Sequence, residues 1–346
     1  MKFYLVTGGS GYFGSILVDH ILAGGNKCIN IDICPPVRQH PHLINLICDI
    51  RNYDDLLDVF KQYGPFHAVF HVAAMLAHAI KDKKALLDSN INGTENIVRA
   101  CAEFRIKNLV FTSSNCLWGK PFNRPVTEED QPEPVEIYGF SKMEAERILF
   151  SYSDKVNSAI LRVPTIVSSG RLGLLAILFE FIEENKTVWI VGKGTNKYQF
   201  IYGPDLAEAA MKASSINTTR IYNVGSDHVK TLYEIYHYVI EKANSKSKIK
   251  CLPKTPALMG MKIAHFLKIS PLGPYHYKMI SENFEFDTKR IKSELGWKPT
   301  KTNEEMLFES FQYFKAHKND LNKRQSASAH RKPAQMGIIK LIKWVS

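Results

Sequence analysis

The chain has 346 residues, of which 45% are hydrophobic and 23% are charged, so we expect a soluble globular protein with one large domain or two unequal ones. No apolar run reaches the roughly 18–20 residues that span a bilayer, so the sequence does not predict a transmembrane helix. Residues 316–346 carry six of the eleven net positive charges, so the body of the chain is only mildly basic and does not indicate a nucleic-acid partner.

The first half of the chain alternates short apolar strands with helical patterns. The apolar start is too short for a signal peptide, and we interpret it as the first strand. Strands are expected at residues 2–7, 27–32, 43–50, 67–74, 108–114 and 157–163, and helices at 12–23, 54–59, 91–101 and 138–150. This alternation predicts an α/β fold with a doubly wound, Rossmann-type parallel sheet.

After Val167 the alternation of strands and helices becomes less regular. Helices are expected at residues 172–183, 204–214, 231–243 and 303–317, and strands at 187–191 and 198–202. We expect residues 1–167, with a return at 195–228, to form the cofactor-binding domain, and 168–194 with 229–315 to form a smaller C-terminal substrate-binding domain. Within the latter, residues 254–277 are rich in Pro, Met and Leu and are expected to cap a pocket. Residues 316–346 predict a flexible basic linker and a short tail.

A glycine-rich segment, VTGGSGYFGS, lies between the first expected strand and the first expected helix. Gly8, Gly11 and Gly14 permit a tight turn and let a pyrophosphate approach the backbone at a helix N-terminus. Because both flanking elements are present, we interpret the motif as a dinucleotide site. Asp32 ends the second strand, where a carboxylate accepts the ribose hydroxyls of NAD and repels the 2′-phosphate of NADP. A loop-start cap is the alternative role for Asp32.

Tyr138 and Lys142 lie four residues apart and therefore share one face of a helix. Such a pair also occurs by chance, but here Ser113 and Ser114 end the fifth expected strand, where side chains reach the crevice of a doubly wound sheet. In a reaction that moves a hydride and a proton, Tyr138 would exchange the proton of the reacting alcohol. Lys142 and the positive nicotinamide ring would lower the pKa of the phenol from about 10.

Together these segments resemble an extended short-chain dehydrogenase/reductase of the NAD-dependent epimerase/dehydratase group. The resemblance covers roughly residues 1–315. It is carried by TGGSGYFG, Asp32, CDI at 48–50, FHVAA at 70–74, NINGTENI at 90–97, FTSSNCLWG at 111–119, the Tyr138/Lys142 pair, YNVGS at 222–226 and FDTKRIKSELGWKP at 286–299.

The resemblance implies NAD as the cofactor and Ser114, Tyr138 and Lys142 as the catalytic residues. It places Asn90 near the site and implies that Asp49 and Ile50 flank the adenine. The cofactor-binding residues are then expected to be Gly8, Gly11, Tyr12, Phe13, Gly14, Asp32, Asp49, Ile50, Ala73 and Lys142. A homodimer is also expected.

Several positions depart from the family pattern. Nucleotide-sugar 4,6-dehydratases have a Thr-Asp-Glu sequence where this chain has Ser114, Asn115 and Cys116. Dehydration is therefore not expected. Cys116 instead matches the Ser-x-Cys of enzymes that epimerise beside a ketone, where a thiolate removes an acidic C–H proton; a buried thiol is the simpler interpretation. Thr165 and Tyr198 replace an asparagine and a phosphate-gripping arginine that sugar enzymes usually have.

The sequence thus predicts an NAD-dependent sugar-nucleotide epimerase or a related sugar oxidoreductase, acting on a small-molecule substrate. Two alternatives remain open: a 3β-hydroxysteroid-dehydrogenase-like NAD-dependent alcohol dehydrogenase with a lipophilic substrate, and a non-catalytic NAD-binding scaffold. The residues expected near the substrate are Asn90, Ser113, Cys116, Thr165 and Tyr198.

The cysteines and the C-terminal tail bear on location. The six cysteines have no Cys-x-x-Cys spacing and no matched histidines, so we expect no metal site and reduced thiols in the cytoplasm. In the terminal GIIKLIKWVS, Lys340 and Lys343 fall on one side of a helix, with an apolar stripe opposite and Trp344 at a flank. This pattern predicts peripheral contact with the inner face of a membrane. Docking on the protein's own surface or on a second subunit, or a disordered end, are the alternatives.

Overall fold

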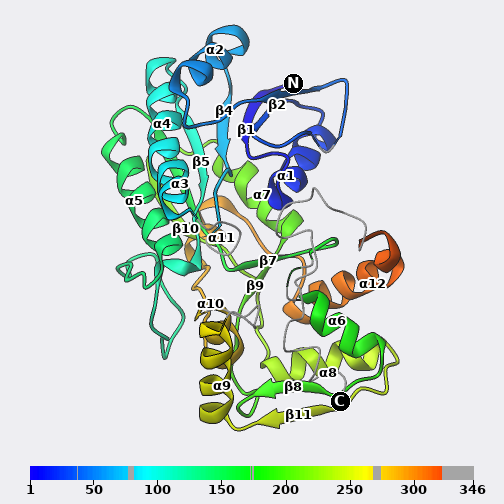
Figure 1. Ribbon diagram of the computed structural model, residues 1–346. Coiled ribbons are helices and arrows are strands. Elements are labelled where there is room, and N and C mark those ends of the chain that lie inside the picture. Colours follow the sequence, from blue (N-terminus) through cyan, green and yellow to red (C-terminus); the bar gives the residue numbers. More distant parts are fainter. Residues whose placement is uncertain (37, 77–81, 172, 174, 268–273, 322–346) are drawn as a thin grey trace.

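A seven-stranded parallel sheet organises the N-terminal part of the chain (Figure 1). The computed structural model describes residues 1–36, 38–76, 82–171, 173, 175–267 and 274–321. The strand order is β10-β6-β5-β4-β1-β2-β3. The strands are β1 (Phe3–Thr7), β2 (Lys27–Asp32), β3 (Leu43–Ile47), β4 (Ala68–His71), β5 (Asn108–Thr112), β6 (Asn157–Arg162) and β10 (Arg220–Asn223).

Helices cover both faces of this sheet, which confirms the doubly wound fold predicted from the sequence. One face packs against α1 (Tyr12–Ala23) and α7 (Gly203–Ala213), and the other against α2 (Tyr53–Tyr63), α4 (Gly93–Glu103) and α5 (Ile137–Ser151). Successive side chains of a strand point to opposite faces. Tyr4 and Val6 of β1 accordingly lie in the α1 core, whereas Leu5 lies in the α4 core.

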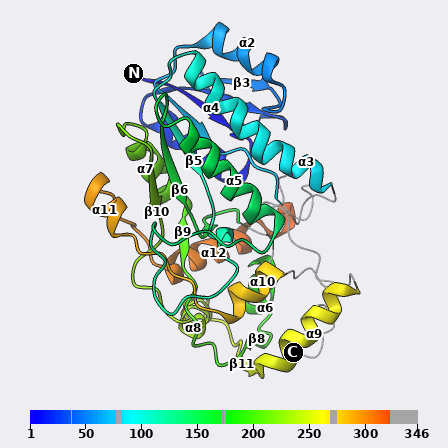
Figure 2. The ribbon, with the colours of Figure 1, turned by 90° about the vertical axis from the view of Figure 1, so that its left-hand side faces the viewer.

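A third hydrophobic core lies at the other end of the molecule, away from α2 (Figures 1 and 2). Two small parallel sheets belong to this half, and the helix α8 begins with a capping box of Thr231 and Glu234. The strands are β7 (Thr165–Val167) paired with β9 (Phe200–Tyr202), and β8 (Val188–Val191) paired with β11 (Ile249–Leu252); the helices are α6 (Leu175–Glu183), α8 (Leu232–Lys242), α9 (Lys254–Phe266), α10 (Pro274–Ser281) and α12 (Asn303–Leu321).

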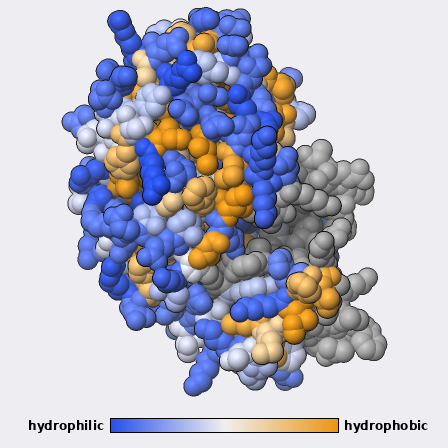
Figure 3. All heavy atoms as spheres, turned by 60° about the vertical axis from the view of Figure 1, so that its left-hand side comes forward, coloured by the Kyte–Doolittle hydropathy of each residue, from blue (hydrophilic) through white to orange (hydrophobic). Residues whose placement is uncertain are grey.

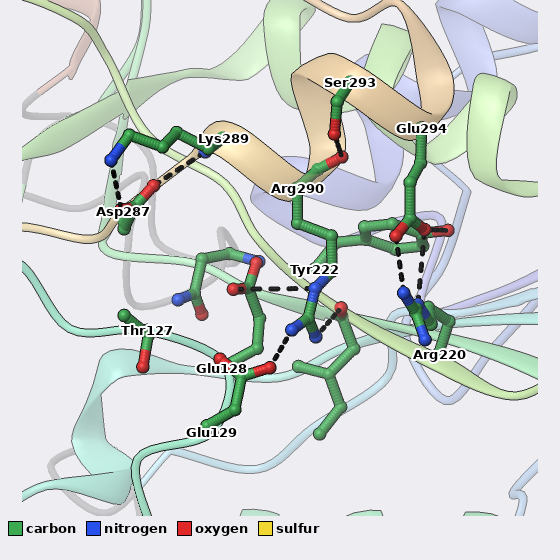
Figure 4. A network of polar contacts seen from close by, with 12 residues as sticks. Thr127, Glu128, Glu129, Arg220, Tyr222, Asp287, Lys289, Arg290, Ser293 and Glu294 are labelled. Carbon is green, nitrogen blue, oxygen red and sulfur yellow. Dashed lines mark hydrogen bonds and ion pairs between the residues drawn. The ribbon is translucent and has the colours of Figure 1, made fainter.

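The segment after α10 returns to the large sheet. It forms α11 (Lys289–Leu295) beside β10, and Figure 4 shows the polar contacts that hold it there. Arg290 donates to the Ile221 carbonyl and pairs with Glu129, while Arg220 and Tyr222 both donate to Glu294.

Beyond α11, Trp297 is fully buried, and its Nε1 donates to the Asp205 carbonyl at 2.8 Å. Asp205 belongs to α7, and its carboxylate also accepts from the backbone N–H and the hydroxyl of Thr300. Residues far along the chain therefore complete the core on the α7 face of the sheet.

Helix α12 continues to Leu321 and so enters the segment that was expected to be a flexible linker from residue 316. Lys318 Nζ lies 2.6 Å from Glu183 of α6, and the rings of Tyr313 and His317 stack at 4.2 Å between centroids. These contacts stabilise the added turn. Residues 322–346, with the expected amphipathic tail, lie outside the described residues. In the described part of the chain, the helices are too short or too polar to cross a membrane.

Candidate active site

The turn between β1 and α1 has the form of an anion-binding cradle. Gly8 has a φ of +74°, and a Cβ there would lie 2.7 Å from the Ala73 backbone; a Cβ at Gly14 would overlap the Gly8 carbonyl oxygen. The N–H of Gly11 donates to that carbonyl at 3.0 Å. No side chain of the described residues caps the N-terminus of α1. Its first N–H groups and its dipole therefore suit the pyrophosphate of a dinucleotide.

Tyr12 and Phe13 serve this turn as anchors. Both side chains are buried, Phe13 in the core under the sheet, and the Tyr12 hydroxyl donates to the Ser168 carbonyl at 2.9 Å. Within the contacts described, their side chains fix the start of α1, and their backbone N–H groups belong to the cradle.

Asp32 stands at the end of β2, directly beside the glycine turn. Its carboxylate accepts from Ser10 N–H at 3.0 Å and from Cys34 N–H at 2.9 Å. Each carboxylate oxygen accepts about two hydrogen bonds, so one site on each oxygen remains for a ribose hydroxyl. The two roles expected for Asp32, a loop cap and a ribose acceptor, are thus compatible.

Asp49 and Ile50, expected at the adenine, and Ala73, expected elsewhere at the cofactor, are held by their own partners. Asp49 accepts from the Arg51 guanidinium at 3.0 Å, and this hydrogen bond is the main cause that lowers the pKa of the carboxyl. Ile50 is buried against Gly93, where a Cβ would lie 2.7 Å from its Cδ1. The Ala73 N–H donates to the Thr7 hydroxyl at 3.2 Å.

A buried histidine that the sequence reasoning missed links the cradle to α4. The Thr94 hydroxyl donates to the Asn90 carbonyl at 2.7 Å, so its oxygen accepts from His71 Nε2 at 2.9 Å. Nδ1 is then left to accept from Thr7 at 2.8 Å. Burial, and to a lesser extent the Lys142 charge, lower the pKa of His71 to about 3. The histidine is therefore neutral, and each of its hydrogen bonds has a fixed direction.

Asn90 lies in a single π-helical turn, Asp88–Asn92, between α3 (Lys83–Leu87) and α4. Its Oδ1 accepts from Met75 N–H at 2.8 Å, and its Nδ2 donates to the Met75 carbonyl and to Ser141 Oγ, both at 3.0 Å. Both amide protons are used, so Asn90 positions the chain after β4 against the first turn of α5.

Tyr138 and Lys142 begin helix α5 at the carboxyl end of β5. Lys142 is only 2% exposed, and its Nζ donates to the Thr112 carbonyl at 2.9 Å and lies 6.0 Å from the centroid of the Tyr138 ring. Burial lowers the pKa of Lys142 to about 7, against the opposing charge of Glu146. A positive charge on Lys142 would favour an adjacent phenolate, and the tuning of Tyr138 by Lys142 stays a prediction from their spacing.

Ser114 and Cys116 lie beside this helix start. Ser114 Oγ accepts from the Cys116 N–H at 3.1 Å and so begins the turn η2 (Asn115–Leu117). The Cys116 carbonyl packs so closely on Gly139 that a Cβ there would overlap it. This contact brings the turn η2, with the half-buried Cys116, beside the first turn of α5, which contains Tyr138.

Ser113 differs from its expected role at the crevice. Its hydroxyl is buried and donates to Glu146 at 2.6 Å. Glu146 also pairs with Arg162 at 2.7 Å, and the two charged side chains are only 6% and 3% exposed. Ser113 therefore serves this buried ion pair, and Ser114 remains the hydroxyl expected at the candidate site.

Thr165 and Tyr198 contact the hydrophobic core of the second half of the chain. Thr165 Oγ1 is 3.9 Å from the sulfur of Met279 in α10. Tyr198 is 3% exposed, packs between Phe200 and Phe284, and accepts a hydrogen bond from Asn115 Nδ2 at 2.7 Å. Tyr198 therefore ties this core to the turn after Ser114. Among the described residues there is no cluster of His, Cys, Asp or Glu that could hold a metal ion.

Comparison with known proteins supports the doubly wound fold. The sequence matches the NAD-dependent epimerase/dehydratase family over residues 4–225. It is 35% identical to the uncharacterised protein y4nG of Sinorhizobium fredii, over 99% of this chain and 86% of that protein. It is 28% identical to a UDP-glucose 4-epimerase of Lacticaseibacillus casei, over 64% of this chain and 76% of that protein. The fold is similar to a Thermotoga maritima UDP-glucose 4-epimerase solved with UDP-glucose, with a TM-score of 0.76 and 21% identity over 92% of this chain and 100% of that one.

Proposed function

Because the chain belongs to the NAD-dependent epimerase/dehydratase family of extended short-chain dehydrogenases/reductases, we propose that it is a sugar-nucleotide epimerase or a related sugar oxidoreductase. The observation that carries the proposal is the placement of Tyr138, Lys142 and Ser114 at the carboxyl end of β5, two strands from the glycine cradle that follows β1. Ligands of doubly wound sheets bind at this edge.

NAD is the cofactor of this family, and the residues present fit it. The cradle from Gly8 to Gly14 would hold the pyrophosphate, and Asp32 would accept the ribose hydroxyls. Bound NAD would supply the hydride acceptor. In the proposed reaction Tyr138 Oη removes the proton of the substrate alcohol and returns it, Ser114 Oγ holds the same oxygen, and Lys142 stabilises the phenolate.

Elimination of water is not part of the proposal. The residues after Ser114 are Asn115 and Cys116, and Asn115 is buried with its amide donating to Tyr198. Neither side chain is a carboxylate that could remove a proton during dehydration.

The first test is turnover of UDP-glucose and UDP-galactose by the purified protein with NAD. We expect the two sugars to interconvert without net accumulation of NADH, because the hydride leaves the sugar and returns to it in each cycle. Chromatography of the sugar nucleotides and NADH absorbance are read in the same reaction. Stoichiometric NADH from a hydroxysteroid, with neither sugar nucleotide converted, would contradict the proposal. That result would favour the alcohol-dehydrogenase alternative, to which the burial of Tyr198 in place of a phosphate-binding arginine points.

Cofactor preference gives a second prediction. Wild-type protein should bind NAD more tightly than NADP, and Asp32→Asn should weaken NAD binding about ten- to a hundredfold, since a hydrogen bond to a charged group contributes about 1.5–3 kcal/mol. The same change should reduce the difference between the binding affinities for NAD and for NADP. Calorimetric titration measures both constants. Asp58→Asn, an exposed acid of α2, is the control and should change neither. Tighter binding of NADP by the wild type would exclude the assigned role.

The homodimer and the peripheral membrane contact expected from the sequence are also part of this proposal. Phe140 and Phe150 of α5 are 44% and 43% exposed, which supports a homodimer through this helix. The residues after Leu321 would add peripheral contact with the cytoplasmic face of a membrane.

A further inference from the structure

Helix α9 exposes an apolar face to solvent. Met259, Ile263, Phe266 and the following Leu267 are 59%, 55%, 84% and 57% exposed. Their spacing of four, seven and eight residues places them on one stripe of the helix. Figure 2 shows α9 at the edge of the molecule, and Figure 3 shows hydrophobic side chains gathered at the same end. Exposed apolar residues that gather in one patch mark an interaction surface.

The orientation of α9 is fixed by contacts on its other side. Ala264 is buried, the Tyr277 hydroxyl of α10 donates to the Met261 carbonyl at 3.0 Å, and Lys254 Nζ donates to the Ser281 carbonyl at 2.9 Å. The helix is therefore held by its inner side, with the stripe of Met259, Ile263, Phe266 and Leu267 turned outward. We call this stripe the outer face of α9.

The charges of helix α9 itself have one sign. Helix α9 contains no Asp or Glu in its sequence, and its lysines are Lys254 and Lys262. Lys262 is exposed and lies within the stretch that forms the outer face. An apolar stripe flanked by an exposed lysine, on a helix without acids, is complementary to an anionic lipid surface, where apolar side chains enter the acyl boundary and the lysine meets the headgroups.

A second copy of the chain suits this face poorly. In a two-fold contact the same patch meets itself, so Lys262 of both copies would come together without an acid of α9 between them. Four side chains over about two helical turns also offer much less than the roughly 800 Å² per partner of a stable protein interface.

We infer that the outer face of α9 contacts the surface of an anionic lipid bilayer. The contact is made by a folded helix of the substrate side of the molecule, and it is separate from the contact proposed for the tail. A cavity lined by Phe122, Asn123, Asn196 and Lys254 opens at the start of the same helix.

The test is co-sedimentation of the full-length protein with vesicles of phosphatidylcholine, with and without phosphatidylglycerol. We expect binding to the anionic vesicles, and at least a tenfold lower partition coefficient for Ile263→Glu/Phe266→Glu, since each large apolar side chain buried contributes roughly a tenfold change or more. Ile47→Glu, a change at an apolar residue that is 67% exposed on β3, is the matched control and should bind like the wild type. Lys340→Glu/Lys343→Glu measures the tail separately.

The variants alter exposed side chains, so their circular dichroism and thermal midpoint should match those of the wild type. Vesicle binding is read without turnover, so a wrong assignment of the reaction leaves this test intact. Equal partition of wild type and the α9 variant, or no binding of wild type to anionic vesicles, would overturn the inference. A larger particle in solution that becomes smaller in the α9 variant would assign the face to a contact between copies and overturn it as well.

Discussion

Tyr138→Phe should lower kcat by about 10²–10⁴-fold and leave NAD affinity nearly unchanged, which is the range for loss of a general acid–base group. The phenylalanine ring can occupy the same place at the start of α5, but it has no proton to exchange. Turnover of the sugar nucleotides used in the first test and calorimetric titration with NAD measure the two effects separately.

The same helix offers a matched control. Tyr152 follows the last turn of α5, so Tyr152→Phe makes the same chemical change far from Ser114 and Lys142 and should retain wild-type kcat. If Tyr138→Phe also turns over at the wild-type rate, Tyr138 is not the acid–base group.

Glu146→Gln should lower the free energy of unfolding by about 3–5 kcal/mol. The change removes the counter-charge of Arg162, whose guanidinium is only 3% exposed and would remain buried beside a neutral amide. Ser113 would also lose the carboxylate that accepts its proton. Urea denaturation of both proteins measures the difference, with the slope of each transition checked for equality.

An exposed ion pair on the same helix is the comparison. Glu144 pairs with Arg147 at 2.7 Å, and these side chains are 26% and 68% exposed. Glu144→Gln should cost no more than about 1 kcal/mol because water solvates the charge that is left. Equal losses for the two variants would mean that the buried pair contributes no more than a surface pair.

The large sheet could be predicted from the sequence because its first six strands are apolar runs that alternate with helices. The short strands β7, β10 and β11 were missed, since three or four residues show no period. Helices α9 and α10 were expected only as an undefined cap. In α9, apolar residues occupy both the buried side and the outer face, so the pattern that normally reveals a surface helix is absent.

The candidate site divides in the same way. Spacing along the chain was enough to place the glycine turn, Asp32 and the Tyr138/Lys142 pair at strand ends of the sheet, which meet at one edge, and their roles there stay predictions. The hydrogen bonds of His71, and the bond between Tyr198 and Asn115 across 83 residues, depend on contacts between distant segments. The local sequence pattern contains no signal for contacts between distant segments.

The burial of Trp297 has a consequence for synthesis of the protein. A ribosome adds about 5–20 residues per second, so the seven strands of the large sheet leave it several seconds before residues 297–300 do. Until then α7 lacks the indole that covers it, and the Asp205 carboxylate lacks both of its Thr300 donors. Part of the apolar interior of the half that contains the large sheet is therefore exposed to water until residues 297–300 have been synthesised. These residues follow most of the second half in the sequence.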